Sequence, residues 1–266
     1  MKKVSWVFSK AYKKFNTDRC PLLASALVHA TVFSLFPLFL GLISFSLFIL
    51  GSSEGIIEKI LPILKQIFPI GIDEIVKNIS AIKQTSIVIA IIGILGFLWG
   101  AASIFRALES TLNVIWKVKK DRPFFKKSLL TIGSAFVVFI LLIASFGVTI
   151  LINALGAGGV LQLMRGYNTI FSIVLSVCLF SLVYWHFPNR RVQFSAACLG
   201  ALFTGICWEA AKFFFSFYIT NVVDFSKIYG SLSVIFLLFL WLYYSAYIFL
   251  YGAELSYVYA RRKILR

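Results

Sequence analysis

The chain has 266 residues, of which 60% are hydrophobic and only 14% are charged, and its formal net charge is +16. Soluble domains carry about 25% charged and roughly 45–50% apolar residues, so this composition excludes an ordinary soluble enzyme. The basic excess would favour a nucleic-acid partner in a soluble chain, but here the bases border long apolar runs, where the positive-inside rule and anionic headgroups account for them. The composition predicts an all-α, polytopic membrane protein with a single transmembrane domain over residues 1–266.

The first predicted element is an amphipathic helix over residues 2–15. Apolar side chains recur there at the i, i+3, i+4 and i+7 spacing of one helical face, and lysines occupy the opposite face. We expect this helix to lie in a membrane interface, drawn to anionic lipid; the alternative is a solvated helix packed on its own protein. The apolar positions are Val4, Val7, Phe8, Ala11, Tyr12 and Phe15, and the basic ones are Lys3, Lys10, Lys13 and Lys14.

Apolar runs then recur along the chain, and a bilayer core requires about 20 apolar residues of helix. The first run, from Cys20 to Ser53, contains no acid or base and is far longer than the apolar part of a signal peptide, so we expect a retained span. Residues 52–84 carry acids and bases in equal number along two apolar stripes, which predicts an extracytoplasmic amphipathic helical hairpin between spans 1 and 2. The six predicted transmembrane helices cover approximately residues 21–50, 86–105, 128–152, 169–187, 194–217 and 229–253.

The basic residues determine the predicted orientation. Nineteen of the 26 Lys and Arg residues fall in segments on the same side as the two termini, and six fall in segments on the opposite side. Because cytoplasmic segments carry the excess of Lys and Arg, we expect both termini in the cytoplasm. The expected partners are membrane lipids, with anionic headgroups on the cytoplasmic face.

Two ionisable residues inside span 5 give the strongest indication of a functional site in the sequence. Glu209 and Lys212 stand at i and i+3, so their side chains share one helix face. Glu209 lies about 14 residues, or roughly 21 Å, from the cytoplasmic end of the span. Ionisable groups at such depth cost about 2.5–3.5 kcal/mol and usually face protein or a water-filled cavity. A functional polar pair and a structural ion pair, with Lys212 snorkelling to the outer interface, are both open.

Other polar residues mark two further candidate sites. Arg106 and Glu109 repeat the i, i+3 spacing at the inner end of span 2, and Glu254 at the inner end of span 6 could join them in a cytoplasmic-end polar cluster. An interfacial salt bridge is the simplest interpretation of that cluster. Candidates for the lining of a cavity are His29 in span 1 and Tyr243 and Tyr247 in span 6; the alternatives are a hydrogen-bonded packing histidine and ordinary helix packing.

Signals of catalysis are missing from the sequence. It contains no Walker loop, dinucleotide fingerprint, HExxH or GxSxG motif. Its four cysteines have no CxxC spacing, and its two histidines have no nearby carboxylate or cysteine, so no metal site is expected. The basic clusters lack an accompanying RNA-binding fold. We expect no enzyme activity, no catalytic residue, no cofactor and no nucleic-acid partner.

Several short stretches occur in a fixed order along nearly the whole chain. They are Ser34-Leu35-Phe36-Pro37-Leu38, Ser103-Ile104-Phe105-Arg106-Ala107-Leu108 leading to Trp116, Pro188-Asn189-Arg190-Arg191, Trp208-Glu209 with Lys212, Tyr229-Gly230-Ser231-Leu232, and Trp241-Leu242-Tyr243 through Gly252-Ala253-Glu254-Leu255. Together they resemble the YihY/BrkB family of bacterial inner-membrane proteins. The family usually has two aromatic residues where this chain has Val28-His29, so a role for His29 would not be a family feature.

The resemblance implies six spans with cytoplasmic termini in the bacterial cytoplasmic (inner) membrane. It also implies an association with virulence or with envelope lipid. Many members carry the label "ribonuclease BN", which is widely regarded as a misassignment, and this sequence offers no nuclease site.

Two hypotheses from different classes account for the sequence. The first is a transporter of lipid or another envelope amphiphile, motivated by the Glu209/Lys212 pair, the interfacial helices and the lack of catalytic motifs. The alternative is a non-transporting envelope scaffold or integrity protein that docks an envelope protein through the 52–84 hairpin or forms a homo-oligomer. A membrane ribonuclease is disfavoured.

Overall fold

The computed structural model describes residues 2–50, 86–119, 129, 133, 168–221 and 232–262. Within this part of the chain every element of regular structure is an α-helix, as predicted. The hairpin predicted over 52–84 and the span predicted over 128–152 lie outside the described residues and stay predictions. The helices are α1 (Lys2–Thr17), α2 (Cys20–Leu50), α5 (Ser86–Ile115), α8 (Asn168–His186), α9 (Phe194–Asn221) and α11 (Leu232–Ala260).

Three stretches among the described residues are long and apolar enough to cross a membrane: Cys20–Leu38, Phe194–Phe215 and Ile235–Ala260. A shorter apolar helix covers Ser176–His186. Within an 18-residue window of each stretch, 22%, 33% and 28% of the residues are buried inside the chain, and large apolar side chains such as Leu22, Phe213 and Phe236 are exposed. Such surfaces suit lipid, because a helix satisfies all its backbone hydrogen bonds internally. The structure is that of an α-helical membrane protein, and the count of six spans stays a prediction.

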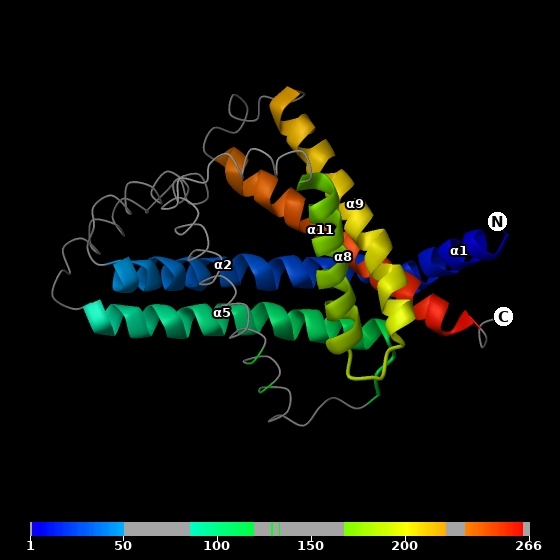
Figure 1. Ribbon diagram of the computed structural model, residues 1–266, viewed down its shortest axis with the longest axis horizontal. Coiled ribbons are helices and arrows are strands. Elements are labelled where there is room, and N and C mark those ends of the chain that lie inside the picture. The colour runs from blue at the N-terminus through cyan, green and yellow to red at the C-terminus, as the bar shows by residue number, and fades with distance from the viewer. Residues whose placement is uncertain are drawn as a thin grey trace.

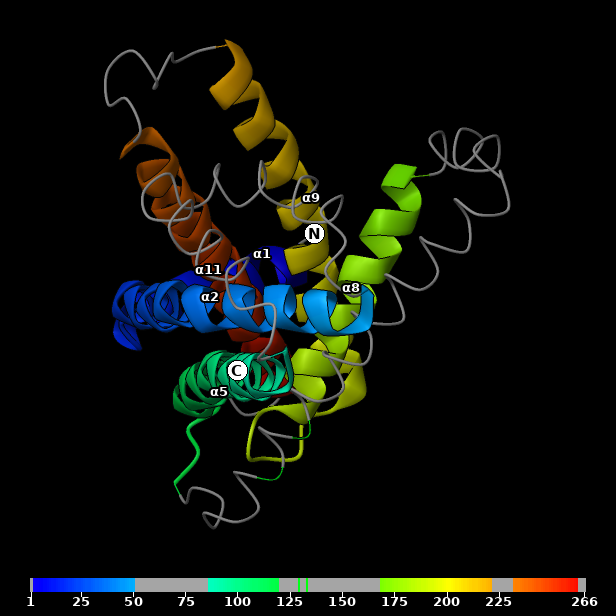
Figure 2. The same cartoon turned by 90° about the vertical axis from the view of Figure 1, so that its left-hand side faces the viewer.

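The helices form two pairs that meet on α11. Antiparallel α2 and α5 lie side by side along their lengths, and α8 and α9 form the second pair. Helix α11 contacts both α2 and α9, while α1 packs along the last turns of α11 (Figures 1 and 2). Both termini therefore lie at the same end of the molecule, called the terminal end below (Figure 1).

Glycines allow the closest helix contacts. A Cβ atom on Gly200 of α9 would lie 2.4 Å from the carbonyl oxygen of Gly252 of α11, and one on Gly252 would lie 1.8 Å from Thr204 Oγ1. In the other pair, a Cβ atom on Gly100 of α5 would lie 2.9 Å from the carbonyl oxygen of Ser34 of α2. Small residues let membrane helices pack by close backbone approach, since lipid supplies no hydrophobic force between helices.

A buried hydroxyl joins three of the helices near the Gly200–Gly252 contact. The Tyr184 hydroxyl of α8 donates to the Phe249 carbonyl of α11 at 2.6 Å and lies 2.8 Å from Thr204 Oγ1 of α9. Thr204 in turn donates to the Gly200 carbonyl at 3.0 Å. A buried hydroxyl requires such partners, so this contact orients α8, α9 and α11 relative to one another.

Helix α1 coincides with the predicted amphipathic helix, but part of its apolar face is covered by protein. Ala11 and Phe15 are buried, and the Phe15 ring lies 5.3 Å from that of Tyr247 and 5.8 Å from that of Tyr251 on α11. Tyr12, in contrast, is 61% exposed. The packed-helix interpretation therefore accounts for Ala11 and Phe15, while the exposed aromatics and lysines of α1 are available to a membrane interface.

Candidate functional site

Four charged side chains from three distant segments meet at the terminal end. Lys14 lies in the last turn of α1 and Asp18 directly follows that helix, Lys117 follows α5, and Glu254 lies near the end of α11. The side chains of Asp18 and Glu254 are only 2% and 0% exposed. Two acids face two bases, so this charge network (Lys14, Asp18, Lys117 and Glu254) is neutral, as buried ions require.

Lys14 is the centre of the charge network. Its ammonium contacts the Asp18 carboxylate and lies 2.9 Å from Glu254 Oε2. It also donates to the Ile115 carbonyl at 2.9 Å and lies 4.0 Å above the ring of Tyr257. The other Asp18 oxygen contacts the Lys117 ammonium. A single lysine thus connects α1 to α11 and to the carboxyl end of α5, where a cation also stabilises the helix dipole.

The turns beside the charge network carry backbone strain. Arg19 and Lys117 have φ angles of 53° and 54°, a left-handed conformation that favours glycine. Helix α5 ends in a Schellman motif, with Val118 N–H donating to the Asn113 carbonyl at 3.0 Å and Lys117 N–H to the Val114 carbonyl at 3.1 Å. Because the usual residue at this position is glycine, the ion pair with Asp18 is one reason for a lysine there.

The charges of Asp18 and Lys117 stabilise each other. Burial alone would raise the pKa of Asp18, but hydrogen bonds and charge attraction from Lys117 and Lys14 outweigh burial and hold the pKa below its usual 3.8. The hydrogen bond to Asp18 raises the pKa of Lys117 above its usual 10.5, against the opposing effect of burial. Both groups are therefore ionised at neutral pH.

The loop between α8 and α9 packs onto the same end of α5. Asn189 N–H donates to Asn113 Oδ1 at 2.7 Å, and the Arg190 guanidinium lies 3.4 Å from the Trp116 carbonyl. Bases thus cap the last carbonyls of α5 from both sides. The Pro188-Asn189-Arg190-Arg191 stretch therefore contributes to the packing of the terminal end.

The predicted cytoplasmic-end cluster is brought together only in part. Glu254 belongs to the charge network, with Lys14 as its ion-pair partner. Glu109 is fully buried, whereas Arg106 is exposed with its guanidinium 3.4 Å from Ser103 Oγ. Sequence reasoning missed Lys14, Asp18 and Lys117 as members of this site. One signal was available, because Asp18 is the only acid among the first 53 residues.

Glu209 and Lys212 form an ion pair on α9. Lys212 Nζ lies 2.7 Å from Glu209 Oε1, and Ser176 of α8 donates to the same oxygen at 2.9 Å. The Glu209 side chain is 13% exposed and that of Lys212 is 43% exposed. The pair therefore lies at the α8–α9 contact with its cationic side facing outward, an arrangement that both interpretations of the pair allow.

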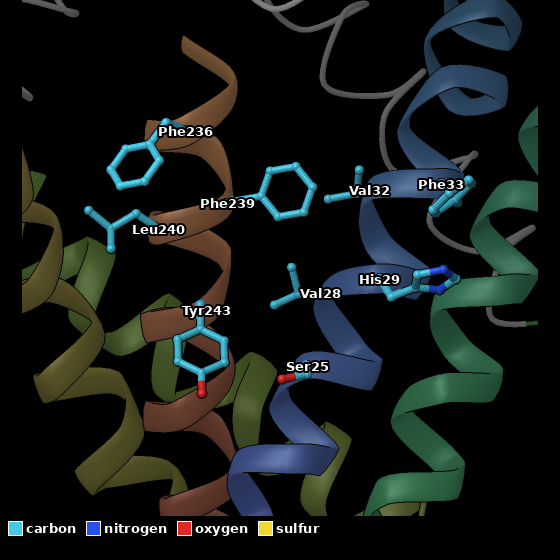
Figure 3. A pocket seen from close by; sticks show the side chains of 9 residues that line it. All are labelled: Ser25, Val28, His29, Val32, Phe33, Phe236, Phe239, Leu240 and Tyr243. Atoms are coloured by element: carbon cyan, nitrogen blue, oxygen red, sulfur yellow. The ribbon is translucent and has the colours of Figure 1, made fainter. Parts of the chain in front are cut away.

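A groove of about 460 Å³ lies between α2 and α11, two of the helices with candidate membrane spans. Its sides are almost entirely apolar, and the hydroxyls of Ser25 and Tyr243 lie at the same end of it (Figure 3). This end is the one nearer the terminal end, because it contains the earlier part of α2 and the later part of α11. The lining residues are Ser25, Val28, His29, Val32, Phe33, Phe236, Phe239, Leu240 and Tyr243.

Two of the three predicted cavity-lining residues border this groove. His29 and Phe33 lie at its rim with ring centroids 4.5 Å apart, and both side chains point away from α11 (Figure 3). Tyr243 lines the groove and donates a hydrogen bond to the Tyr247 hydroxyl at 3.3 Å. Tyr247 thus contacts the groove through Tyr243. Among the described residues, no three His, Cys, Asp or Glu side chains gather as a metal site would require.

The fold and its apolar stretches define the class of protein, a multipass α-helical membrane protein. The family model described as "Virulence factor BrkB" matches residues 11–265. The chain therefore belongs to the BrkB family, as the ordered sequence stretches predicted.

Curated relatives are likewise described as membrane proteins. The chain is 31% identical over 267 residues to a "UPF0761 membrane protein" of Prosthecochloris aestuarii, an alignment that covers 96% of this chain and 62% of the relative. It is 33% identical over 251 residues to a UPF0761 membrane protein of Pseudoalteromonas translucida, with 90% of this chain and 81% of the relative covered. The chain thus spans less than two thirds of the Prosthecochloris protein. No solved structure matches the chain.

Proposed function

We propose that this protein is a transporter that moves a lipid or another envelope amphiphile across the bacterial inner membrane. The observation that carries the proposal is the groove between α2 and α11, which combines apolar sides with hydroxyls at one end. Its volume of about 460 Å³ is within the roughly 300–1,000 Å³ range of ligand sites. An amphiphile has the matching polarity, with its polar part at Ser25 and Tyr243 and its acyl chain along Val28, Val32 and Phe239.

The position of the groove also supports an occupant from the membrane. Both helices that line it carry candidate membrane spans, so a lipid reaches it laterally without leaving the bilayer. Phe33 and Phe236 at its border are 66% and 48% exposed. In this proposal both termini are cytoplasmic, and the protein acts without a catalytic residue or cofactor of its own. The Glu209/Lys212 pair lies at the α8–α9 contact, outside the lining of the groove, so its part in transport is tested separately.

The scaffold hypothesis depends on residues 52–84, which lie outside the described residues. Its test is a pull-down of envelope proteins with and without that segment. The groove gives the transporter hypothesis a specific observation, so transport is the proposal to test first.

The decisive experiment is translocation of labelled phospholipid in proteoliposomes. Val32→Phe adds a ring inside the groove, and we expect it to slow translocation about tenfold, or about 1.4 kcal/mol, because the ring takes up space that a lipid chain would occupy. The matched control is Val174→Phe, because Val174 is 55% exposed on α8. Translocation that is equal in the two variants would contradict a role for the groove. Glu209→Gln, measured in parallel, decides whether the α9 ion pair takes part or is structural.

A further inference from the structure

The charge network joins the two helices that line the groove. Asp18 lies in the turn between α1 and α2, Cys20 is the first residue of α2, and Glu254 lies about three turns beyond Tyr243 on α11. Lys14 contacts Asp18 and lies 2.9 Å from Glu254 Oε2, while the Cys20 thiol donates to Glu254 Oε1 at 3.5 Å. We infer that the charge network is a latch that holds these ends of α2 and α11 together and so controls the width of the groove. The inference deepens the proposed function, since it concerns the regulation of the same groove.

The latch depends on how one ammonium is shared. Lys14 serves two buried carboxylates and its side chain is 15% exposed, whereas Lys117 binds the second oxygen of Asp18 and is 52% exposed. While Lys117 satisfies Asp18, Lys14 is available to Glu254. When Lys117 is removed or bound by another anion, Asp18 draws Lys14 toward itself. The contact between Lys14 and Glu254 then weakens, and the end of α11 is released.

A second set of contacts leads from α1 to the groove. The Phe15 ring of α1 lies 5.3 Å from that of Tyr247, and the Tyr247 hydroxyl accepts a hydrogen bond from Tyr243, which lines the groove. Release of α1 therefore removes the Phe15 ring from the Tyr247 side chain that is hydrogen-bonded to Tyr243 at the polar end of the groove. Packed interfaces of this kind switch between discrete arrangements instead of deforming continuously, which is the behaviour that a latch requires.

Cys20 provides a natural reporter of the latch, because it is fully buried beside Glu254. The full chain carries Cys178→Ala, Cys198→Ala and Cys207→Ala, is placed in phosphatidylcholine nanodiscs, and is treated with a water-soluble methanethiosulfonate reagent. Local opening governs access to a buried group, so we expect Lys117→Gln to raise the labelling rate of Cys20 at least about tenfold. Lys117→Arg keeps the positive charge and should label Cys20 at the rate of the parent protein.

The matched control for charge is Lys13→Gln, which removes one exposed lysine of α1 that no carboxylate of the charge network contacts. It should label like the parent protein. Equal labelling of the parent, Lys117→Gln and Lys13→Gln would overturn the latch.

A distance measurement across the groove separates a latch from a structural brace. Spin labels are attached at Val32→Cys on α2 and Phe239→Cys on α11, in a chain with Cys178→Ala, Cys198→Ala, Cys207→Ala and Cys20→Ser, since serine keeps a donor for Glu254. We expect Glu254→Gln and Lys117→Gln to lengthen or broaden the distance distribution and Lys13→Gln to leave it unchanged. A brace would leave the distribution unchanged in every variant that folds, and that result would overturn control of the groove.

The two proposals fail in different ways. In one outcome, the spin-label distances change with Glu254→Gln and Lys117→Gln, but the protein translocates no phospholipid. This result contradicts the proposed transport and leaves the latch supported. Translocation that is sensitive to Val32→Phe, together with a distance distribution unaffected by Glu254→Gln and Lys117→Gln, overturns the latch and leaves transport supported.

Discussion

Lys14 illustrates what an apolar helix bundle requires of a charged residue. Its ammonium has two carboxylates, the Ile115 carbonyl and the face of the Tyr257 ring within reach. Burial of an unpaired ion costs several kcal/mol, and removing one partner of a buried pair costs about 3–5 kcal/mol. The charges of Asp18 and Glu254 are tolerated because each has a lysine in contact. Single substitutions within the charge network are therefore expected to lower the stability of the folded protein strongly.

Asp18 makes stability depend on pH in the acid range. Its pKa in the folded protein is lowered from the usual 3.8, so its contribution is complete above that value and is lost as pH falls through the folded pKa. We expect Asp18→Asn to destabilise the detergent-solubilised protein at pH 7 by about 1–3 kcal/mol, less than for a fully buried pair because Lys117 is half-exposed. The difference in melting temperature between parent and variant should shrink between pH 6 and pH 3. A difference that stays constant over this range would contradict the assignment.

At the residue level, the sequence draws attention to Glu254 and Tyr243 but does not show which residues surround them. Ionisable or hydroxyl groups inside apolar runs are visible in a sequence, and both residues do lie in the charge network or the groove. The partner of Glu254 is Lys14, 240 positions away in the chain, and no local period encodes such a contact. The sequence pattern predicts Lys14 on the polar face of an interfacial helix, which is correct for an isolated helix but leaves out packing against α11.

The sequence predicts the bounds of the helices more closely than the contacts between them. The predicted span 21–50 corresponds to Cys20–Leu50, and the predicted span 194–217 to Phe194–Asn221, because long apolar runs bounded by charges or proline leave little choice. The predicted span 86–105 ends ten residues before Ile115, where α5 ends. The apolar run stops near Arg106, but helical hydrogen bonding continues until the Schellman motif at Lys117. Hydropathy therefore locates the apolar part of α5 and misses its extension.

The contact between α9 and α11 leads to a prediction about glycine. We expect Gly252→Ala to lower the melting temperature by several degrees, corresponding to about 1–3 kcal/mol of overpacking, because its Cβ would lie 1.8 Å from Thr204 Oγ1. Gly96→Ala on α5 is the matched control, since the nearest atom to its Cβ is the Pro37 carbonyl oxygen at 3.5 Å. Alanine at Gly96 should be neutral or stabilising, as expected for a better helix former. Equal thermal shifts for the two variants, measured in the same detergent, would contradict this account of the helix contact.

For the whole molecule, the directions of α2 and α5 agree with the predicted topology. Helix α2 leaves the terminal end and α5 returns to it, and α11 ends there (Figure 1). Helix α8 runs across the α2–α5 pair in this view, so its direction does not set the number of membrane crossings (Figure 1). The span over 128–152 and the count of six stay predictions from the sequence.

The same arrangement predicts on which side of the membrane each segment lies. Both termini lie at one end (Figure 1), and 19 of the 26 Lys and Arg residues belong to segments predicted on that side, so the positive-inside rule assigns this end to the cytoplasm. Green fluorescent protein fused to either terminus should therefore fluoresce, and alkaline phosphatase fused there should be inactive. Phosphatase inserted between Leu50 and Ser86 should be active, because α2 ends and α5 begins at the opposite end. Active phosphatase at either terminus would reverse the orientation, and activity at only one terminus would rule out an even number of spans.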